Sequence, residues 1–220
     1  MIKDLFDLKH TIANDLFLNC KYGYEILKDI KNYTIELGKN LNKEEYLEIK
    51  ENIWIHKTAK VSELSTIISP CIIDSDTEIR PGAFIRGSAI VGKDCVIGNS
   101  SELKNVIIFD NAQIPHFNYV GDSIIGYHAH LGAGVITSNL KNDKSNIIIK
   151  DKEKIETGLR KMGSLVGDYV EIGCNSVLCP GTIIKKNTSI YPLTMVRGVI
   201  PENSIVKDKN TIIRKEIKNG

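Results

Sequence analysis

The 220-residue sequence lacks the features that mark several classes of protein. It contains no apolar run of membrane-spanning length. Its first residues, MIKDLFDLKH, carry acidic side chains and no apolar signal-peptide core. We therefore expect no membrane partner and a cytoplasmic location.

The sequence also lacks a strong charge of either sign. Lys plus Arg number 29 and Asp plus Glu number 27, so the formal net charge is only +2. Aromatic residues make up 6% of the chain, and no basic run alternates with them. A nucleic-acid partner is therefore not expected, and a bound phosphate would have to be held by individually placed Arg and Lys side chains.

Cysteine is present, but the number and spacing of the cysteines show no pairing. The five cysteines are odd in number and form no C-x-x-C pair. This argues against a disulfide framework and against a thiolate metal site, and favours reduced thiols in a cytosolic protein. The cysteines are Cys20, Cys71, Cys95, Cys174 and Cys179.

What the sequence does have is a six-residue repeat. Every sixth position from residue 55 is large and apolar at ten successive sites, and the residues between are mostly small or polar. With roughly one residue in three large and apolar, chance would give such a run about once in tens of thousands of trials. After a slip near Pro115 the step resumes at Tyr119, Ile125 and Leu131, and it returns from Val166 to Val196. The ten sites are Ile55, Val61, Ile67, Ile73, Ile79, Ile85, Val91, Ile97, Leu103 and Phe109.

A period of six fits neither an α-helix nor an alternating strand. It fits a triangular coil in which each hexapeptide forms one side and successive turns stack by parallel pairing, roughly 4.8 Å apart. We therefore predict a mainly β chain, a left-handed parallel β-helix over residues 53–206 with a core of aliphatic columns. A sandwich is the alternative, but its turns recur at about 8–12 residues.

Three regions fall outside the repeat. Residues 1–52 show an amphipathic pattern over 5–16, a second helical stretch over 22–37 ended by Gly38, and a capping-box sequence at 42–45. We predict a small N-terminal helical cap that covers the open edge of the first coils. Residues 138–163 are predicted to leave the coil as a charged, rather basic loop, either solvated or functional, and 207–220 to form a C-terminal tail.

The densest group of polar residues runs from Arg80 to Asn139. His116 follows Pro115 where the repeat slips, Tyr119 comes soon after, and LGAG at 131–134 offers unobstructed backbone N–H groups. A base, a phenol and free amides are what acyl transfer to an amine requires, because the base takes a proton from the amine and the amides stabilise the oxyanion. A structural role for His116 at a corner of the coil is the alternative.

Five segments resemble one known family. They are RPGA at 80–83, GNSSELKN at 98–105, PHFNYVGDSIIG at 115–126, LGAGVITSN at 131–139 and TGLRKMGSLVGDYVEIG at 157–173. Together they resemble the acetyltransferase domain of the bifunctional N-acetylglucosamine-1-phosphate uridyltransferase/glucosamine-1-phosphate acetyltransferase family and of similar archaeal sugar-1-phosphate transferases. The resemblance covers about residues 53–206. That family's nucleotidyltransferase domain has no counterpart, since residues 1–50 contain no Gly-rich, Arg-containing phosphate loop.

The resemblance implies an acyltransferase that uses acetyl-CoA to N-acetylate an amino sugar phosphate or a sugar nucleotide. It also implies a homotrimer with its site between two subunits. His116 matches the general base, Asn139 an active-site asparagine, and the Ala133 amide one that contacts the acetyl carbonyl. Cys174 corresponds to a serine near the pantetheine of CoA.

Further matches concern the sugar and its phosphate. Lys104 and Tyr119 match the residues that hold them, and Arg80 matches the phosphate-binding arginine of RPGA. Arg86 lies at the family's usual distance from Asn99, so either arginine can take that role.

Two positions depart from the family. His130 stands where an asparagine usually precedes the LGAG-like segment, in a position we assign to substrate binding, and Leu140 replaces a tyrosine. These departures leave open a sugar-nucleotide-binding protein without catalysis. His116, His128 and His130 leave open a metal-dependent hydratase of the carbonic anhydrase type, although that family uses a histidine pair five residues apart.

Overall fold

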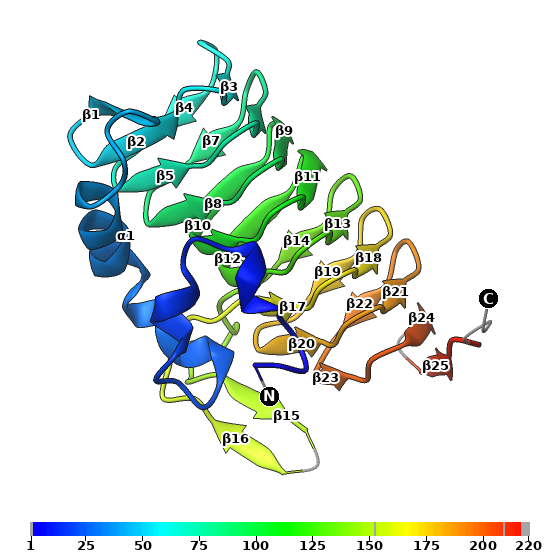
Figure 1. Cartoon of the computed structure of the whole chain (residues 1–220). Coiled ribbons are helices and arrows are strands. Elements are labelled where there is room, and N and C mark those ends of the chain that lie inside the picture. Colours follow the sequence, from blue (N-terminus) through cyan, green and yellow to red (C-terminus); the bar gives the residue numbers. More distant parts are fainter. Residues whose placement is uncertain (1, 152, 209, 217–220) are drawn as a thin grey trace.

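A triangular solenoid of parallel strands forms the body of the computed structural model, which describes residues 2–151, 153–208 and 210–216 (Figure 1). The predicted left-handed parallel β-helix is confirmed. Each coil contributes to three flat faces, which we call faces I, II and III in the order in which the chain first reaches them. The corners between them are named by the faces they join.

Face I and face II each contain eight strands, paired in parallel with the strand of the next coil. Face I consists of β2 (Ile53–His56), β5 (Cys71–Ile73), β8 (Ala89–Val91), the second halves of β10 (Glu102–Ile108) and β12 (Tyr119–Ile125), β17 (Ser164–Val166), β20 (Thr182–Ile184) and β23 (Val199–Ile200). Face II consists of β3 (Lys60–Val61), β6 (Glu78–Ile79), β9 (Val96–Asn99), β11 (Gln113–His116), β13 (His130–Leu131), β18 (Glu171–Ile172), β21 (Ser189–Ile190) and β24 (Ser204–Asp208).

Face III completes the triangle and carries most of the residues discussed below. It consists of β4 (Thr66–Ile67), β7 (Phe84–Ile85), the first halves of β10 and β12, β14 (Ile136–Thr137), β19 (Val177–Leu178) and β22 (Met195–Val196). The inward side chains of the three faces form the aliphatic columns that the repeat predicted. Burial of these columns is the main source of stability of the coil.

The slip in the repeat lies earlier than predicted. From Leu103 on face III to Ile108, the next position of the hydrophobic repeat on face I, the step shortens from six to five, because β10 runs through the III/I corner without a break. Phe109, predicted as a column residue, therefore lies outside the coil against Phe6, with ring centroids 5.0 Å apart. The same shortening recurs in β12, where Val120 fills the column and Tyr119 points outward.

The N-terminal segment covers face I and is less regular than predicted. In place of one amphipathic helix over 5–16 it has the 3-10 helices η1 (Leu8–His10) and η2 (Asn14–Phe17), followed by η3 (Gly23–Lys28) and the α-helix α1 (Ile30–Lys39). These elements pack along one side of the solenoid rather than over its first edge alone (Figure 1). The outward residues of face I that they cover are Trp54, Ile72, Ile90, Ile107, Ile124, Leu165 and Ile183.

Both ends of the solenoid are closed by antiparallel strands. At the first coil β1 (Tyr46–Lys50) pairs with β2, and it follows a turn where the capping-box pattern predicted a short helix. At the last coil β25 (Thr211–Arg214), within the predicted tail, pairs with β24. Gly38, predicted to end its helix, lies inside α1, where a Cβ atom would be 2.1 Å from the Trp54 ring.

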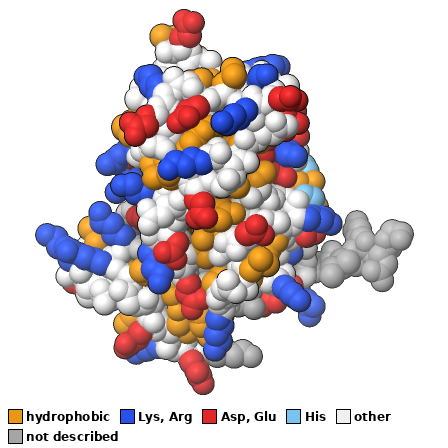
Figure 2. Space-filling model, turned by 60° about the vertical axis from the view of Figure 1, so that its left-hand side comes forward, with side chains coloured by type: hydrophobic (Ala, Val, Ile, Leu, Met, Phe, Trp, Pro, Cys, Tyr) orange, Lys and Arg blue, Asp and Glu red, His pale blue; other side chains and the backbone are white. Residues whose placement is uncertain are grey.

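The predicted loop at 138–163 contains a hairpin, β15 (Ile148–Lys150) and β16 (Lys154–Glu156), that projects from the solenoid (Figure 1). Its base packs through Ile147, Ile149 and Met162 into the cluster beneath the N-terminal segment. None of the helices in the described ranges is long and apolar enough to cross a membrane. Acidic and basic side chains are interspersed over the face drawn in Figure 2.

The packing on face I leads to a first prediction. Ile107 has no exposed surface although it points out of the coil, so Ile107→Ala should lower the free energy of unfolding by about 2–5 kcal/mol. It should also increase proteolytic cleavage within residues 2–39. Ile68→Ala is the matched control, because Ile68 is 46% exposed, and should change stability by less than about 0.5 kcal/mol. Urea unfolding and limited proteolysis provide the measurements, and equal losses for the two variants would contradict the packing described.

Candidate functional site

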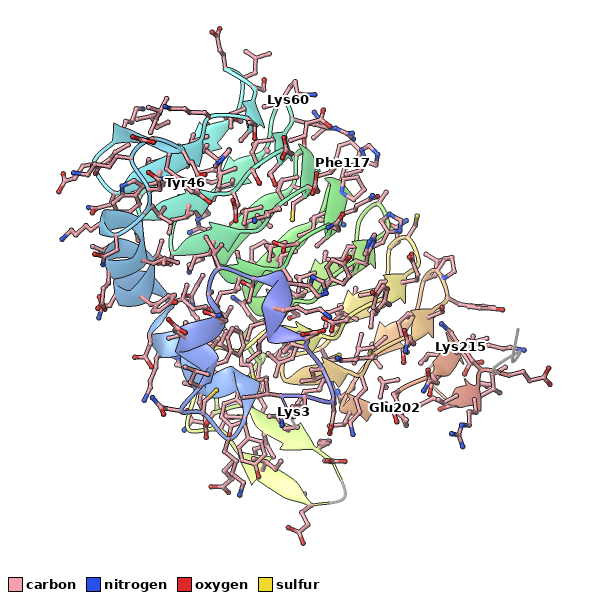
Figure 3. All side chains as sticks on the ribbon, in the orientation of Figure 1. Lys3, Tyr46, Lys60, Phe117, Glu202 and Lys215 are labelled. Atoms are coloured by element: carbon pink, nitrogen blue, oxygen red, sulfur yellow. The ribbon has the colours of Figure 1, made fainter. Side chains whose placement is uncertain are left out.

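His116 is the last residue of β11 and lies at the II/III corner. Its backbone N–H donates to Asn118 Oδ1 at 3.0 Å, and its carbonyl accepts from the Gly134 N–H at 3.0 Å. These bonds fix the main chain on both sides and leave the side chain exposed. The next residue, Phe117, lies at the edge of the solenoid far from Tyr46 (Figure 3). The imidazole is therefore presented outward from a rigid corner and does not fill a column.

Residues on successive coils align with His116 at this corner. Asn99 is its register partner on the coil before, and Ala133 and Cys174 occupy the same place on the next two coils. The Ala133 carbonyl accepts from the Asn175 N–H at 2.8 Å, whereas the Ala133 N–H bonds to none of the described residues. One coil, roughly 4.8 Å, separates this free amide from the His116 backbone.

Tyr119 and Asn139 form a second polar group, at the start and end of face III. Asn139 Nδ2 donates to the Tyr119 hydroxyl at 3.2 Å and to Asp122 Oδ2 at 2.5 Å. Burial raises the pKa of the Tyr119 phenol above its ordinary value, and the nearby carboxylate of Asp122 acts in the same direction. The phenol therefore stays protonated at neutral pH and, while accepting from Asn139, keeps its own proton to donate.

The predicted phosphate-binding residues occupy two places. Arg86 and Lys104 come directly after the paired residues Ile85 and Leu103 of adjacent coils, at the end of face III nearest the III/I corner. Arg86 Nη1 lies 2.6 Å from Glu102 Oε1, and Glu102 is the register partner of Tyr119. Tyr119 begins face III on the next coil, but its hydroxyl reaches Asn139 at the far end of the face, which is the end where Arg86 and Lys104 lie.

Arg80 is placed differently. It lies at the II/III corner, two coils before the coil of His116, and its Nε is 3.1 Å from Glu78 Oε1 on the same coil. Two coils correspond to roughly 10 Å along the axis. The structure therefore separates Arg80 from His116 along the II/III corner, and the width of face III separates it from Lys104 and the Tyr119 hydroxyl at the III/I end.

The other two histidines of the sequence pattern are directed elsewhere. His130 lies on face II, where its Nδ1 is 3.0 Å from Glu171 Oε2. His128 is exposed and stacks on Tyr169, with ring centroids 5.6 Å apart. Within the described ranges, no group of three His, Cys, Asp or Glu residues could hold a metal ion. The arrangement gives no support to the hydratase hypothesis.

A cleft of about 530 Å³ lies between the 138–150 segment and the later coils of face III. It begins beside Asn139, because Ser138 and Leu140 contribute to its lining. The sequence indicated a basic loop but not that this loop would form one side of a cleft with cationic lining residues. Lys141, Lys150 and Arg197 line the cleft together with Asp143, Val177 and Cys179.

Comparisons with known proteins show which proteins this chain is similar to. A family model described as the GMPPB C-terminal domain matches residues 67–159. The "Bifunctional protein GlmU" of Methanococcus maripaludis is 37% identical over 139 residues, which are 63% of this chain and 34% of that protein. The "Bifunctional sugar-1-phosphate nucleotidylyltransferase/acetyltransferase" of Sulfurisphaera tokodaii is 34% identical over 173 residues, which are 76% of this chain and 43% of that protein.

The predicted relationship to the acetyltransferase domain of the bifunctional family is confirmed. The chain spans between a third and a half of the length of these curated relatives. Among solved structures, the acetyltransferase domain of PglB from Neisseria gonorrhoeae is 15% identical, with 91% of this chain and 76% of that one covered and a TM-score of 0.33.

Cysteine accessibility gives a test of this description. Cys174 is exposed at the corner, whereas Cys71 and Cys95 are buried. Burial raises the pKa of the Cys71 thiol to about 12, and burial also raises the pKa of the Cys95 thiol above its ordinary value. A disulfide reagent should react rapidly with Cys174 and not with Cys71, even when the pH is raised from 7 to 9, because a thiol with a raised pKa stays protonated. Cys174→Ser should remove the fast phase and Cys71→Ser should leave it. Loss of the fast phase in Cys71→Ser would contradict the predicted burial.

Proposed function

We propose that this chain is an enzyme that transfers the acetyl group of acetyl-CoA to the amine of an amino sugar phosphate or sugar nucleotide. The observation that carries the proposal is the grouping, along one side of the solenoid, of the exposed His116 imidazole, the free Ala133 N–H and the bonded pair of Tyr119 and Asn139. The relatives described above support it, because one of their names includes an acetyltransferase activity.

Each of these groups has a part in the chemistry. His116 accepts a proton from the amine as the nitrogen attacks the thioester carbonyl carbon. The Ala133 N–H donates to the carbonyl oxygen as negative charge develops there. The carbon–nitrogen bond forms, the carbon–sulfur bond breaks, and His116 returns the proton to the departing thiolate. Asn139 and Tyr119 orient the acceptor beside the base.

The cleft beside Asn139 suits the second substrate. Its volume of about 530 Å³ lies within the range of small-molecule sites. Arg197 and Lys150 supply positive charge for the phosphates of acetyl-CoA, and Lys141, although its Nζ donates to the Asn146 carbonyl at 2.7 Å, remains a cation at the rim. The apolar part of the lining, Val177 with Cys179, suits the pantetheine arm. Cys174 at the neighbouring corner lies on the path towards Ala133.

Lys104 and Arg86 are the residues that we assign to the acceptor phosphate. Lys104 forms no ion pair with any described residue, and the partner of Arg86, Glu102, is half-buried beside it. An incoming phosphate would join this cluster as a second anion and accept hydrogen bonds from the Arg86 guanidinium N–H groups that face solvent.

The proposed assembly is a homotrimer. Three outward residues of face III on successive coils, Ile136, Val177 and Met195, are 39%, 36% and 48% exposed, and at the II/III corner Phe117 and Leu193 are 63% and 79% exposed. Such a stripe of exposed apolar side chains suits burial against another copy of the chain. Because the stripe adjoins the candidate site and its cleft, a neighbouring subunit would complete both.

The role of His116 is tested by substitution. His116→Ala should reduce kcat about 10²- to 10⁴-fold, because the base is lost, while the affinity for acetyl-CoA changes little. His128→Ala is the matched control and should retain activity, since His128 stacks on Tyr169 at another corner. The enzyme would be incubated with acetyl-CoA and a panel of amino sugar phosphates and nucleotide-linked amino sugars, and mass spectrometry would detect the acetylated products. A wild-type protein that binds a sugar nucleotide in calorimetry but neither binds acetyl-CoA nor acetylates would be a binding protein instead.

The two arginines are distinguished by a matched pair of variants. Arg86→Ala should raise the KM for a phosphorylated acceptor about 10-fold, the effect of losing one charge-assisted hydrogen bond, and leave the KM for the unphosphorylated amino sugar unchanged. Arg80→Ala breaks a comparable surface ion pair, with Glu78, and should have little effect on either acceptor. The opposite result would assign the phosphate to Arg80.

A further inference from the structure

Asp122 is a carboxylate in an unusual setting. It lies within β12 at the III/I corner, in a left-handed backbone conformation with φ 47°, and is 8% exposed. Its Oδ1 accepts from Asn105 Nδ2 at 2.9 Å and its Oδ2 accepts from Asn139 Nδ2 at 2.5 Å. Among the described residues no Lys, Arg or His forms an ion pair with it. A buried carboxylate that is held by amides alone is costly to maintain, which suggests that it serves a purpose other than stability.

The carboxylate determines how the Asn139 side chain is oriented. An ionised carboxylate only accepts hydrogen bonds, so Asn139 must turn its Nδ2 group towards Asp122 and cannot turn its oxygen there. The second hydrogen of Nδ2 is used by the Tyr119 hydroxyl at 3.2 Å. Asn139 Oδ1 is thereby left as an acceptor, and the Tyr119 proton is left as a donor.

Asn105 connects the same carboxylate to the N-terminal segment. Its Nδ2 donates to the backbone carbonyl of Leu27 at 3.0 Å as well as to Asp122. Leu27 belongs to η3, is 3% exposed and lies in the apolar cluster over face I. The docking of η3 therefore limits the positions that the Asn105 amide can take, and through it those of Asp122.

We propose that Asp122 and Asn105 are positioning residues for the acceptor site, and that the N-terminal segment acts on that site through the Leu27 carbonyl. Asp122 fixes the amide of Asn139 so that its oxygen accepts from a donor of the amino sugar, the ammonium group or a hydroxyl, while Tyr119 donates to an oxygen of the same ligand. This inference rests on the proposed function, because it assigns a role within that acceptor site.

The first test is Asp122→Asn, because asparagine has nearly the same shape as aspartate and also tolerates a positive φ. The new amide can donate as well as accept, so Asn139 is no longer held in one orientation. We expect kcat/KM for the acceptor to fall about 10- to 100-fold, with an unchanged acetyl-CoA dissociation constant in calorimetry. Asn105→Gly, which suits the φ of 54° at that position, should reduce kcat/KM in the same direction by about 10-fold.

Asp168→Asn is the control for a purely structural effect. Asp168 is also buried, at 1% exposed, and it accepts the Asp7 and Tyr127 N–H groups, so the variant should lower the Tm. It touches neither Asn105 nor Asn139, and the acceptor KM should stay unchanged. If Asp122→Asn lowers the Tm as Asp168→Asn does and leaves the acceptor kinetics unchanged, the proposal is overturned.

A readout that needs no activity separates this proposal from the function itself. The side-chain amide NMR signals of Asn139, assigned with Asn139→Ala, should exchange with water faster in Asp122→Asn than in the wild type, and not faster in Asp168→Asn. Absence of acetylation by the wild type would refute the proposed function. Unaltered amide exchange in Asp122→Asn would refute the positioning role, whatever the activity.

Discussion

Parallel pairing between successive coils is the constraint on which the rest of the molecule depends. The coils approach so closely that a Cβ atom at Gly98 would lie 1.6 Å from the Pro115 carbonyl oxygen. A fixed spacing aligns residues at equivalent positions of different coils, far apart in sequence, into straight lines along the axis. Asn99, His116, Ala133 and Cys174 form one such line. His116 and the free amide of Ala133 are therefore neighbours because of the stacking, and no loop has to bring them together.

Face I shows a second consequence of the stacking. Its strands carry apolar residues on both sides, so the coil is stable in water only when this face is covered. The N-terminal segment covers it with Phe6, Phe17 and the cluster around them, although it contains little regular helix. Because the III/I corner borders this face, a segment that covers hydrophobic surface also contacts the polar group at Asp122. Stability and site geometry are thus coupled through a shared edge.

The sequence predicts the coil because burial inside it depends only on the period of six. It does not predict exceptions that depend on the neighbouring coil. The predictions for Phe109 and Tyr119 were wrong because shortening a corner by one residue leaves no mark in the hydrophobicity of the sequence. The predicted N-terminal helices were wrong because that segment gains its stability by packing on face I and not from regular helix geometry. The sequence predicts neither the pairing of His130 with Glu171 nor the cleft, because each is formed by segments that only the stacking of coils brings together. The paired isoleucines of CII, VII and SII were a signal of a doubly buried face.

The shortened corner also accounts for the position of the polar group. Before β5, β8 and β20, three residues separate the last inward position of face III from the first of face I, as at Arg86 to Ser88, but in β10 and β12 only two do. The chain then turns through one left-handed residue, Asn105 or Asp122, types that adopt this conformation readily. Their side chains meet on adjacent coils, and Asn139 joins them where the chain leaves the solenoid. A single missing residue, repeated on two coils, therefore interrupts the hydrophobic repeat and creates the place where polar groups can gather.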